Sequence, residues 1–311
     1  MDKAIRKIAV LGTGNMGPGV ATLFAKSGFP VTVWAHSASG RDKALADCET
    51  IAQDLSDNGL LTGEERLALA GRIVVTEDLE AAVVNSDFIS ESIVEDLEAK
   101  RRIIGQIQRI CSSQPIIASN TSTLLPSSLQ EGARDPGSVL VAHFWNPAHL
   151  VPLVEVCGGT LASTEVKVAT VGLLSKVGKD PVVMEKEILG FIGNRLMHAM
   201  YREALSLVHE GIIDAEGIDR VVLSSFGPRF ANLGPMEYLD YIGLDHIRRI
   251  QGYLYSDLEA AGGTTKEIER LNSKGDLGVK TGAGLYDWST RNSGDVRRRR
   301  DAEFLRRQAE G

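Results

Sequence analysis

Two residues with side chains suited to proton transfer, His143 and Glu155, lie in consecutive apolar stretches of the chain. The first stretch, 138–142, is short and β-branched, as in a buried strand, and an Asn-Pro pair ends it. The second, 152–156, also has a strand pattern, so a tight return would bring the two side chains together. A carboxylate that fixes a histidine's tautomer and stabilises its protonated form makes that histidine a general base. Alternatively, His143 is a core histidine with a backbone partner and Glu155 is a surface glutamate.

Other polar residues follow the ends of predicted strands. Strands are predicted at 72–76, 87–91 and 116–119, and they alternate with helical segments. Such alternation indicates a doubly wound parallel sheet, whose ligands bind beyond the carboxyl ends of the strands. We therefore expect one rim of the sheet to carry four polar residues, namely Glu95, Asn120, Ser122 and His143.

A glycine-rich turn follows the first predicted strand, 7–11, and a helix is predicted directly after the turn. The turn has the pattern G-x-G-x-x-G, which binds dinucleotides in this strand–turn–helix setting. Gly12 permits the turn, Gly14 lets the backbone approach a pyrophosphate, and Gly17 lets the helix pack closely on the strand. Free N–H groups at the start of the helix hold the anion. The residues predicted to bind the cofactor here are Gly12, Gly14, Asn15, Met16 and Gly17. The alternative is an ordinary strand-to-helix turn that binds no cofactor.

The second predicted strand, 31–34, lacks the carboxylate that is expected to follow it and to bind the adenosine ribose hydroxyls. Ala35, His36 and Ser37 stand in that place, and Arg41 lies just beyond. Without the carboxylate a 2′-phosphate is not repelled, and His36, Ser37 and Arg41 could bind one. The cofactor predicted from these residues is therefore NAD or NADP.

No strand pattern appears after residue 185, so we expect two domains. The predicted fold class is α/β, a Rossmann-type doubly wound sheet in residues 1–187 followed by an all-α C-terminal domain in residues 188–311. Asn194 falls in the first turn of the first helix of the second domain, where we expect it to face the cleft between the domains. The apolar stripe of 196–208 and the run 238–254 are candidates for contact with a second copy, although packing within the chain explains each as well.

Composition narrows the class of protein further. The chain has 311 residues, 43% hydrophobic and 24% charged, with a net charge of −7, which does not support nucleic acid as a partner. The three cysteines are scattered without a C-x-x-C pattern, which indicates reduced thiols and a cytoplasmic location. The apolar run at 8–11 is too short for a signal peptide or a membrane span. We expect a small-molecule substrate, no bound metal and no membrane partner.

Seven motifs in order are similar to those of the 3-hydroxyacyl-CoA dehydrogenase family over nearly the whole chain. They are the glycine loop at 12–17, Glu91-Ser-Ile-Val-Glu95 with Lys100, Ser119-Asn-Thr-Ser122, His143-Phe-Trp-Asn-Pro147 with Leu153-Val-Glu155-Val, Gly190-Phe-Ile-Gly-Asn194-Arg195, the run from Gly234 to Asp245, and the run from Gly278 to Tyr286.

The resemblance implies a role for each matched residue. His143 would remove the proton of the substrate's 3-hydroxyl, and Glu155 would orient and charge-balance it. Ser122 and Asn194 would hydrogen-bond the substrate oxygen or the adjacent carbonyl. The resemblance also implies a homodimer and a place in fatty acid metabolism. The residues it sets along the nicotinamide half of the cofactor are Glu95, Lys100 and Asn120.

The sequence departs from the family in the segment after the second strand. Where the acyl-CoA enzymes hold basic residues toward the CoA nucleotide, this chain is rich in acids, which would repel the CoA phosphates. The alternative substrate is therefore a small CoA-free hydroxy acid, since the family includes enzymes of carnitine, gulonate and a pyridine carboxylate of vitamin B6 breakdown.

Two other hypotheses compete with a dehydrogenase of this family. Another group of β-hydroxyacid dehydrogenases has a similar glycine-rich start but uses a lysine on its long helix, and residues 193–198 contain no lysine. A non-catalytic dinucleotide-binding protein, as lens crystallins of this family are, would not need the set of Ser122, His143, Glu155 and Asn194. Absence of turnover with every cofactor and hydroxy acid would favour the crystallin-like reading.

Overall fold

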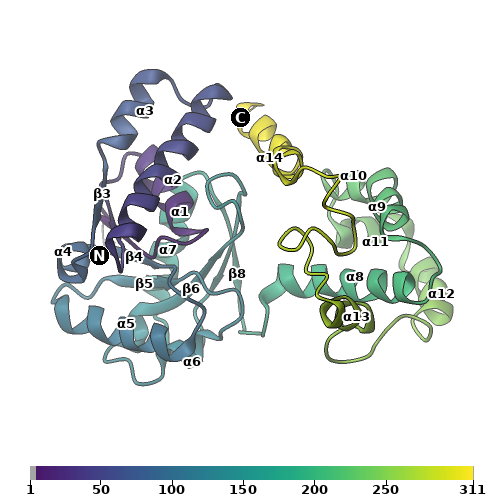
Figure 1. Cartoon of the computed structure of the whole chain (residues 1–311). Helices are drawn as coiled ribbons and strands as arrows, with labels where there is room; N and C mark the ends of the chain where they lie inside the picture. Colours follow the sequence, from purple (N-terminus) through teal and green to yellow (C-terminus); the bar gives the residue numbers. More distant parts are fainter. Residues whose placement is uncertain (1–4, 311) are drawn as a thin grey trace. The chain divides into compact units, whose positions relative to one another are not determined.

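The computed structural model describes residues 5–310, and its first part is built on one eight-stranded sheet (Figure 1). The strand order is β3-β2-β1-β4-β5-β6-β7-β8, with β7 antiparallel to β6 and the other neighbours parallel. This is the expected Rossmann-type doubly wound sheet. The strands are β1 (Ile8–Leu11), β2 (Val31–Trp34), β3 (Ile73–Thr76), β4 (Phe88–Glu91), β5 (Ile116–Ser119), β6 (Val139–Phe144), β7 (Leu153–Cys157) and β8 (Asp180–Met184).

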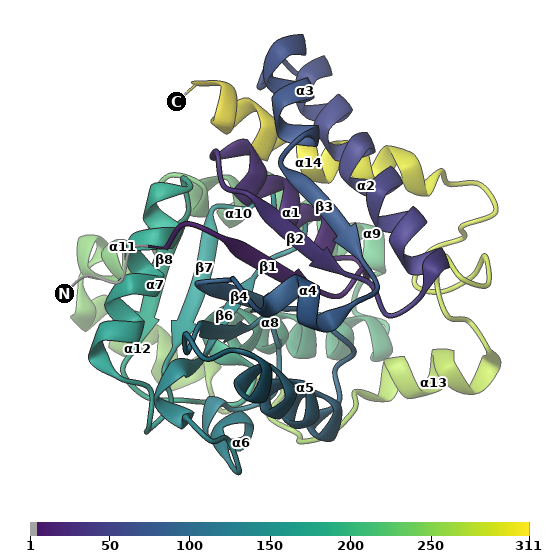
Figure 2. The same ribbon diagram turned by 90° about the vertical axis from the view of Figure 1, so that its left-hand side faces the viewer.

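Helices cover both faces of the sheet, and each face has its own apolar core (Figure 2). Alternate strand residues point to opposite faces, so Ile8 and Val10 join one core while Ala9 and Leu11 join the other. The first core is covered by α1 (Gly17–Lys26), α2 (Ala38–Asp57), α3 (Gly63–Ala70) and α7 (Thr164–Lys176). The second is covered by α4 (Leu79–Val83), α5 (Leu97–Ile110) and α6 (Pro126–Gln130), and a short 3-10 turn, Pro136–Ser138, leads into β6.

The second part of the chain is helical, as expected, with isolated bridges at Gly278, Ala283 and Asp287 as the only β pairing among its described residues. Asp214 accepts a hydrogen bond from the Gly217 N–H and caps α9. The helices are α8 (Phe191–His209), α9 (Ala215–Ser224), α10 (Phe226–Phe230), α11 (Pro235–Ile242), α12 (Leu244–Leu254), α13 (Lys266–Lys274) and α14 (Ser293–Glu310).

Contacts divide the chain differently from the expected boundary at 187/188. One compact unit consists of two segments, the chain up to Ile192 and the chain from Arg298 onward, and the other unit is 193–297. The first difference arises because Phe191 is fully buried in the second core of the sheet. The second arises because Phe304 and Leu305 of α14 pack on the first core, while Gln308 donates hydrogen bonds to the carbonyls of residues 149 and 150.

The segment between β2 and β3 forms two separate helices, α2 and α3. Asn58 ends α2, Gly59 has a positive φ of 73°, and Thr62 starts α3 through a capping box with Glu65.

The three cysteines are free and buried, and the cytoplasmic location stays a prediction. Within residues 5–310, no helix combines the length and the hydropathy that crossing a membrane requires.

Candidate active site

The glycine loop has the geometry that its pattern predicts. Gly12 has a φ of 111°, and a Cβ there would collide with the carbonyl of Ser92. A Cβ on Gly17 would collide with the carbonyl of Gly12, so helix and turn pack without space between them. Gly14, in contrast, has no atom within 4 Å of its Cβ position, and Gly14 and Asn15 are exposed. No side chain caps α1 after Met16, which leaves its first N–H groups for an anion. The loop therefore fits a dinucleotide pyrophosphate.

The residues after β2 lie beside this loop. A Cβ on Gly40, in the first turn of α2, would be 3.0 Å from the Thr13 hydroxyl. Ser37 is the N-cap of α2 and accepts from the Gly40 N–H, and His36 is exposed at the turn. Arg41 does not stand alone, because its guanidinium contacts Asp42 at 3.0 Å and Glu77 at 3.2 Å. The base predicted to receive a 2′-phosphate is thus shared by two carboxylates.

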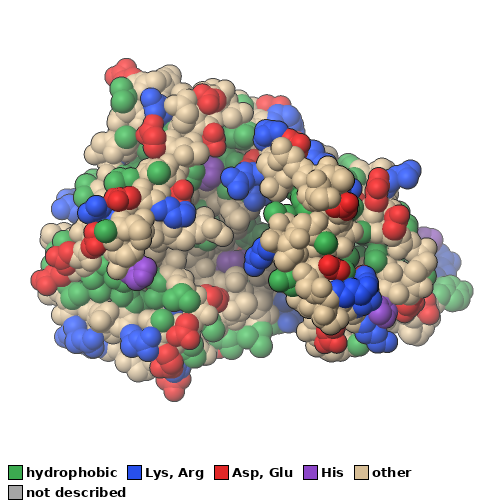
Figure 3. All heavy atoms as spheres, viewed as in Figure 1, with side chains coloured by type: hydrophobic (Ala, Val, Ile, Leu, Met, Phe, Trp, Pro, Cys, Tyr) green, Lys and Arg blue, Asp and Glu red, His purple; other side chains and the backbone are tan. Residues whose placement is uncertain are grey.

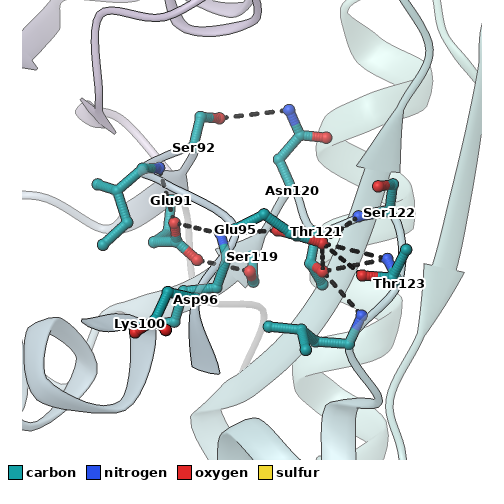
Figure 4. A network of polar contacts seen from close by, with 12 residues as sticks. Glu91, Ser92, Glu95, Asp96, Lys100, Ser119, Asn120, Thr121, Ser122 and Thr123 are labelled. Atoms are coloured by element: carbon teal, nitrogen blue, oxygen red, sulfur yellow. Dashed lines mark hydrogen bonds and ion pairs between the residues drawn. The ribbon is translucent and has the colours of Figure 1, made fainter. Parts of the chain in front are cut away.

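Glu95 organises the loop that follows β5 (Figure 4). Its Oε1 accepts from the hydroxyls of Thr121 and Thr123 and from the backbone N–H groups of Ser122 (3.1 Å) and Thr123 (3.2 Å). Burial alone would raise the pKa of Glu95, but these hydrogen bonds and the charge of Lys100 together hold that pKa below its ordinary value. The carboxylate fixes the backbone that carries Ser122.

Lys100 lies beneath this rim, which differs from the expected position along the cofactor. It is fully buried, and its Nζ donates to Glu91 Oε1 at 2.8 Å and lies 3.5 Å from Glu95 Oε2. Glu91, which is also fully buried, accepts from the Ser119 hydroxyl (2.5 Å) and the Ile93 N–H (2.8 Å). A buried charge needs such partners, so Lys100 holds two carboxylates in place.

Asn120 joins the ends of three strands. Its Nδ2 donates to the Ser92 hydroxyl at 3.3 Å, and its Oδ1 accepts from the Phe144 N–H at 2.8 Å. Because Ser92 follows β4 and Phe144 ends β6, Asn120 aligns the rim on both sides of β5.

His143 and Glu155 form the predicted pair. They stand directly opposite each other in the antiparallel register of β6 and β7, and His143 Nδ1 lies 2.9 Å from Glu155 Oε2. Both side chains are buried, 6% and 1% exposed respectively. The surface-glutamate alternative is therefore wrong, since β7 returns beside β6 and its antiparallel register pairs Glu155 with His143.

Three neighbours that sequence reasoning missed surround the pair. Glu155 also accepts from the Trp145 ring N–H at 3.2 Å and from the Ile192 backbone N–H at 2.8 Å. The rings of Trp145 and Phe191 lie 5.6 and 5.5 Å from the His143 ring. Trp145 stands in the quoted motif and could have been found there, whereas a backbone donor such as Ile192 leaves no signal in residue type.

Two predicted site residues remain, Ser122 and Asn194. Ser122 is positioned by Glu95, as above, while Asn194 lies in the first turn of α8 and belongs to the unit of 193–297. Their contacts with substrate stay predictions. Within the described part of the chain, no group of three or more His, Cys, Asp and Glu side chains is arranged to hold a metal.

A doubly wound sheet with this glycine loop and a buried His–Glu pair at its rim defines the class of dinucleotide-dependent dehydrogenases. Two family models match the chain: 3-hydroxyacyl-CoA dehydrogenase, NAD binding domain, over residues 7–188, and 3-hydroxyacyl-CoA dehydrogenase, C-terminal domain, over residues 190–288. The chain belongs to the 3-hydroxyacyl-CoA dehydrogenase family. It is an enzyme of the NAD-dependent type that acts on CH–OH groups, with NAD as its cofactor.

Relatives in this family differ in their named substrates. The chain is 30% identical over 285 residues to the 5-formyl-3-hydroxy-2-methylpyridine 4-carboxylate 5-dehydrogenase of Mesorhizobium japonicum. The match covers 91% of this chain and 90% of that protein. It is 32% identical over 295 residues to a probable 3-hydroxybutyryl-CoA dehydrogenase of Bacillus subtilis, covering 93% and 99%.

Among solved structures, a 5-formyl-3-hydroxy-2-methylpyridine 4-carboxylic acid 5-dehydrogenase, described as an NAD⁺-dependent dismutase, matches with a TM-score of 0.90. The identity is 28%, and the match covers 99% of each chain.

Proposed function

We propose that this enzyme oxidises the hydroxyl of a hydroxy acid, free or as its 3-hydroxyacyl-CoA thioester, to the keto product with His143 as the general base, reversibly. The observation that carries the proposal is the buried 2.9 Å hydrogen bond between His143 Nδ1 and Glu155. A carboxylate can only accept hydrogen bonds, so Nδ1 holds the proton and Nε2 presents a lone pair. A base on the rim of a dinucleotide-binding sheet suits alcohol oxidation.

The residues of the chain divide the work. His143 Nε2 takes the hydroxyl proton, and the negative charge of Glu155 stabilises the imidazolium that forms. Ser122 and Asn194 hydrogen-bond the substrate oxygen or the adjacent carbonyl, and Glu95 keeps Ser122 in position. Bound NAD supplies the hydride acceptor. In the reverse direction the imidazolium returns the proton to the keto oxygen.

Charge near the cofactor end of the sheet favours a substrate without CoA. Over 38–70 the chain carries three bases, and each one pairs with a carboxylate: Arg41 with Glu77 and Asp42, Lys43 with Asp47, and Arg66 with Glu49. None of the three is left as an uncompensated positive charge for the phosphates of a CoA nucleotide. We therefore favour a small CoA-free hydroxy acid, which would remove the expected place in fatty acid metabolism.

A paired substrate screen tests both levels of the proposal. NADH formation is measured with 3-hydroxybutyryl-CoA and free 3-hydroxybutyrate, and with carnitine, gulonate and hydroxymethyl pyridine carboxylates. We expect a free acid to give the highest kcat/KM. A CoA thioester that exceeds every free acid by about tenfold, or roughly 1.4 kcal/mol, would reverse the substrate preference. No turnover with any of them would contradict the oxidoreductase proposal.

We also propose that the enzyme is a homodimer formed through residues 193–297. Within these residues only Glu267 and Leu271 are buried, and Figure 3 shows hydrophobic side chains on this unit's surface. A stable interface needs about 1,200–2,000 Å² of buried surface, and a second copy of the same helices would supply it. The large exposed hydrophobic residues include Leu223, Met236, Tyr241, Leu244, Tyr253 and Tyr255.

Sedimentation of Tyr241→Glu and Tyr253→Glu variants tests the dimer, because these side chains are 82% and 84% exposed. We expect a dimer for the wild type and a monomer for at least one variant. Leu161→Glu, which changes an exposed residue of the sheet-containing unit, is the matched control and should remain dimeric. A wild-type monomer at micromolar concentration would rule the proposal out.

A further inference from the structure

The carboxylate missing after β2 has a counterpart on the neighbouring strand. In a sheet of this kind the adenosine ribose is bound at the carboxyl end of β2, where this chain has Ala35-His36-Ser37. β3 pairs with β2 in parallel (Figure 2). Trp34 is in register with Thr76. Glu77 is the next residue, so its side chain begins at the same edge of the sheet.

Backbone and side-chain contacts fix Glu77 against β2 and α2. The Trp34 ring N–H donates to the Glu77 carbonyl at 3.1 Å, and the Ala35 N–H donates to the Thr76 carbonyl at 2.9 Å. The Glu77 carboxylate accepts from Arg41 through Oε1 at 3.2 Å. Arg41 follows Gly40, whose Cα packs beside Thr13 of the glycine loop. Glu77 is therefore tied to the turn of α2 that lies against the cofactor loop.

The charge of this group opposes a phosphate. Arg41 contributes +1, and Asp42 and Glu77 contribute −1 each, so the three side chains together carry −1. Glu77 is 43% exposed, and its ion pair uses Oε1, which leaves Oε2 to accept hydrogen bonds. A carboxylate oxygen in that place accepts from ribose hydroxyls and repels a 2′-phosphate.

We propose that Glu77, supplied by β3, takes the role of the missing carboxylate after β2 and, by occupying Arg41, makes the enzyme select NAD over NADP. Arg41 is already paired with Glu77 and Asp42 and is not a phosphate receptor. This role of Glu77 is an alternative to the interpretation of His36, Ser37 and Arg41 as a 2′-phosphate site, which stays a prediction until cofactor binding is measured. The inference depends on the NAD-binding domain and is independent of the substrate proposed above.

Direct cofactor binding tests this role without any substrate, so its outcome is separate from that of the substrate screen. NADH and NADPH are titrated by fluorescence against the full-length wild type, Glu77→Gln, Arg41→Ala and Glu80→Gln. We expect the wild type to bind NADH at least about tenfold more tightly than NADPH, a difference of about 1.4 kcal/mol. Glu77→Gln should narrow that ratio to about threefold or less, because NADH loses a charged acceptor and NADPH meets an Arg41 that has lost one of its two ion pairs.

Two variants separate this role from general charge effects. Arg41→Ala should keep or widen the preference for NADH, since Glu77 then faces the ribose without a counter-charge. Glu80→Gln makes the same change of charge three residues away, at an exposed position, and should leave the ratio unchanged. The proposal is overturned if the wild type binds NADPH as tightly as NADH, if Glu77→Gln leaves the ratio within twofold of wild type, or if Arg41→Ala selectively abolishes NADPH binding.

Discussion

Replacing Glu155 with glutamine removes the charge beside His143 and changes one oxygen into an N–H donor. Both oxygens of the native carboxylate accept hydrogen bonds, Oε2 from His143 Nδ1 and the Trp145 ring N–H, and Oε1 from the Ile192 N–H. Wherever the new amide nitrogen stands, it faces at least one of these N–H groups. The side chain is 1% exposed, so a mispaired donor there costs about 1–3 kcal/mol of stability.

The effect on catalysis should be larger than the effect on folding. At about 4 Å and an effective dielectric constant of about 20, a carboxylate and an imidazolium attract by about 4 kcal/mol. Losing half or all of that attraction when His143 becomes protonated lowers turnover by roughly 30- to 1,000-fold. Partial screening sets the lower end of this range.

The assay is kcat at saturating NAD with the substrate found by the screen, alongside NADH binding and thermal unfolding. Ser163→Ala is the control matched for stability, because it removes the N-cap of α7 at a cost of about 1 kcal/mol without touching the pair. It should keep its activity. If Glu155→Gln turns over within about threefold of wild type, the carboxylate does not stabilise a charged His143 and the reasoning fails.

Two further outcomes follow from shifted pKa values. The pKa of Glu95 is lowered in the folded protein, so the stability that its carboxylate contributes is present above the ordinary glutamate pKa and is lost as pH falls through the folded pKa. The melting temperature of the wild type should therefore fall more steeply below about pH 4 than that of Glu95→Gln. Parallel melting curves for the two proteins would contradict the hydrogen-bond network around Glu95. Burial, with the charge of Lys26, lowers the pKa of Lys179 to about 7. Above that pH the unfolded chain binds more protons than the folded protein, so stability rises with pH, and urea unfolding should show the wild type gaining stability relative to Lys179→Met between about pH 7 and 10. A constant difference in the free energy of unfolding would show that the pKa of Lys179 is not lowered.

Much of the candidate site could be predicted because it depends on local pattern. The Asn-Pro break after a β-branched run, with a second strand pattern a few residues later, indicates the β6–β7 return, and the antiparallel register of these strands brings His143 opposite Glu155. The glycine loop is similarly local, since Gly12 has a positive φ and a Cβ on Gly17 would collide with the Gly12 carbonyl of the same turn. The second helical domain follows from the absence of period-two alternation.

Features that depend on the path of the chain could not be predicted. The burial of Lys100 against Glu91 requires α5 to lie across the end of β4, and residue type alone favours an exposed lysine. The return of α14 to the sheet depends on the packing of Phe304 and Leu305 on the first core. The sequence of this helix is highly charged and predicts a solvated helix instead. The role of Glu77 requires the pairing of β2 with β3, which adds a residue from the adjacent strand to the ribose edge.

The base assigned to His143 is tested most directly by His143→Ala. We expect NADH binding to stay within about threefold of wild type, because the glycine loop and the ends of β2 and β3 are untouched. Turnover of the substrate identified by the screen should fall by about 10²- to 10⁴-fold, the usual contribution of a positioned base. Wild-type turnover with intact NADH binding would contradict the assignment of His143 as the residue that takes the hydroxyl proton.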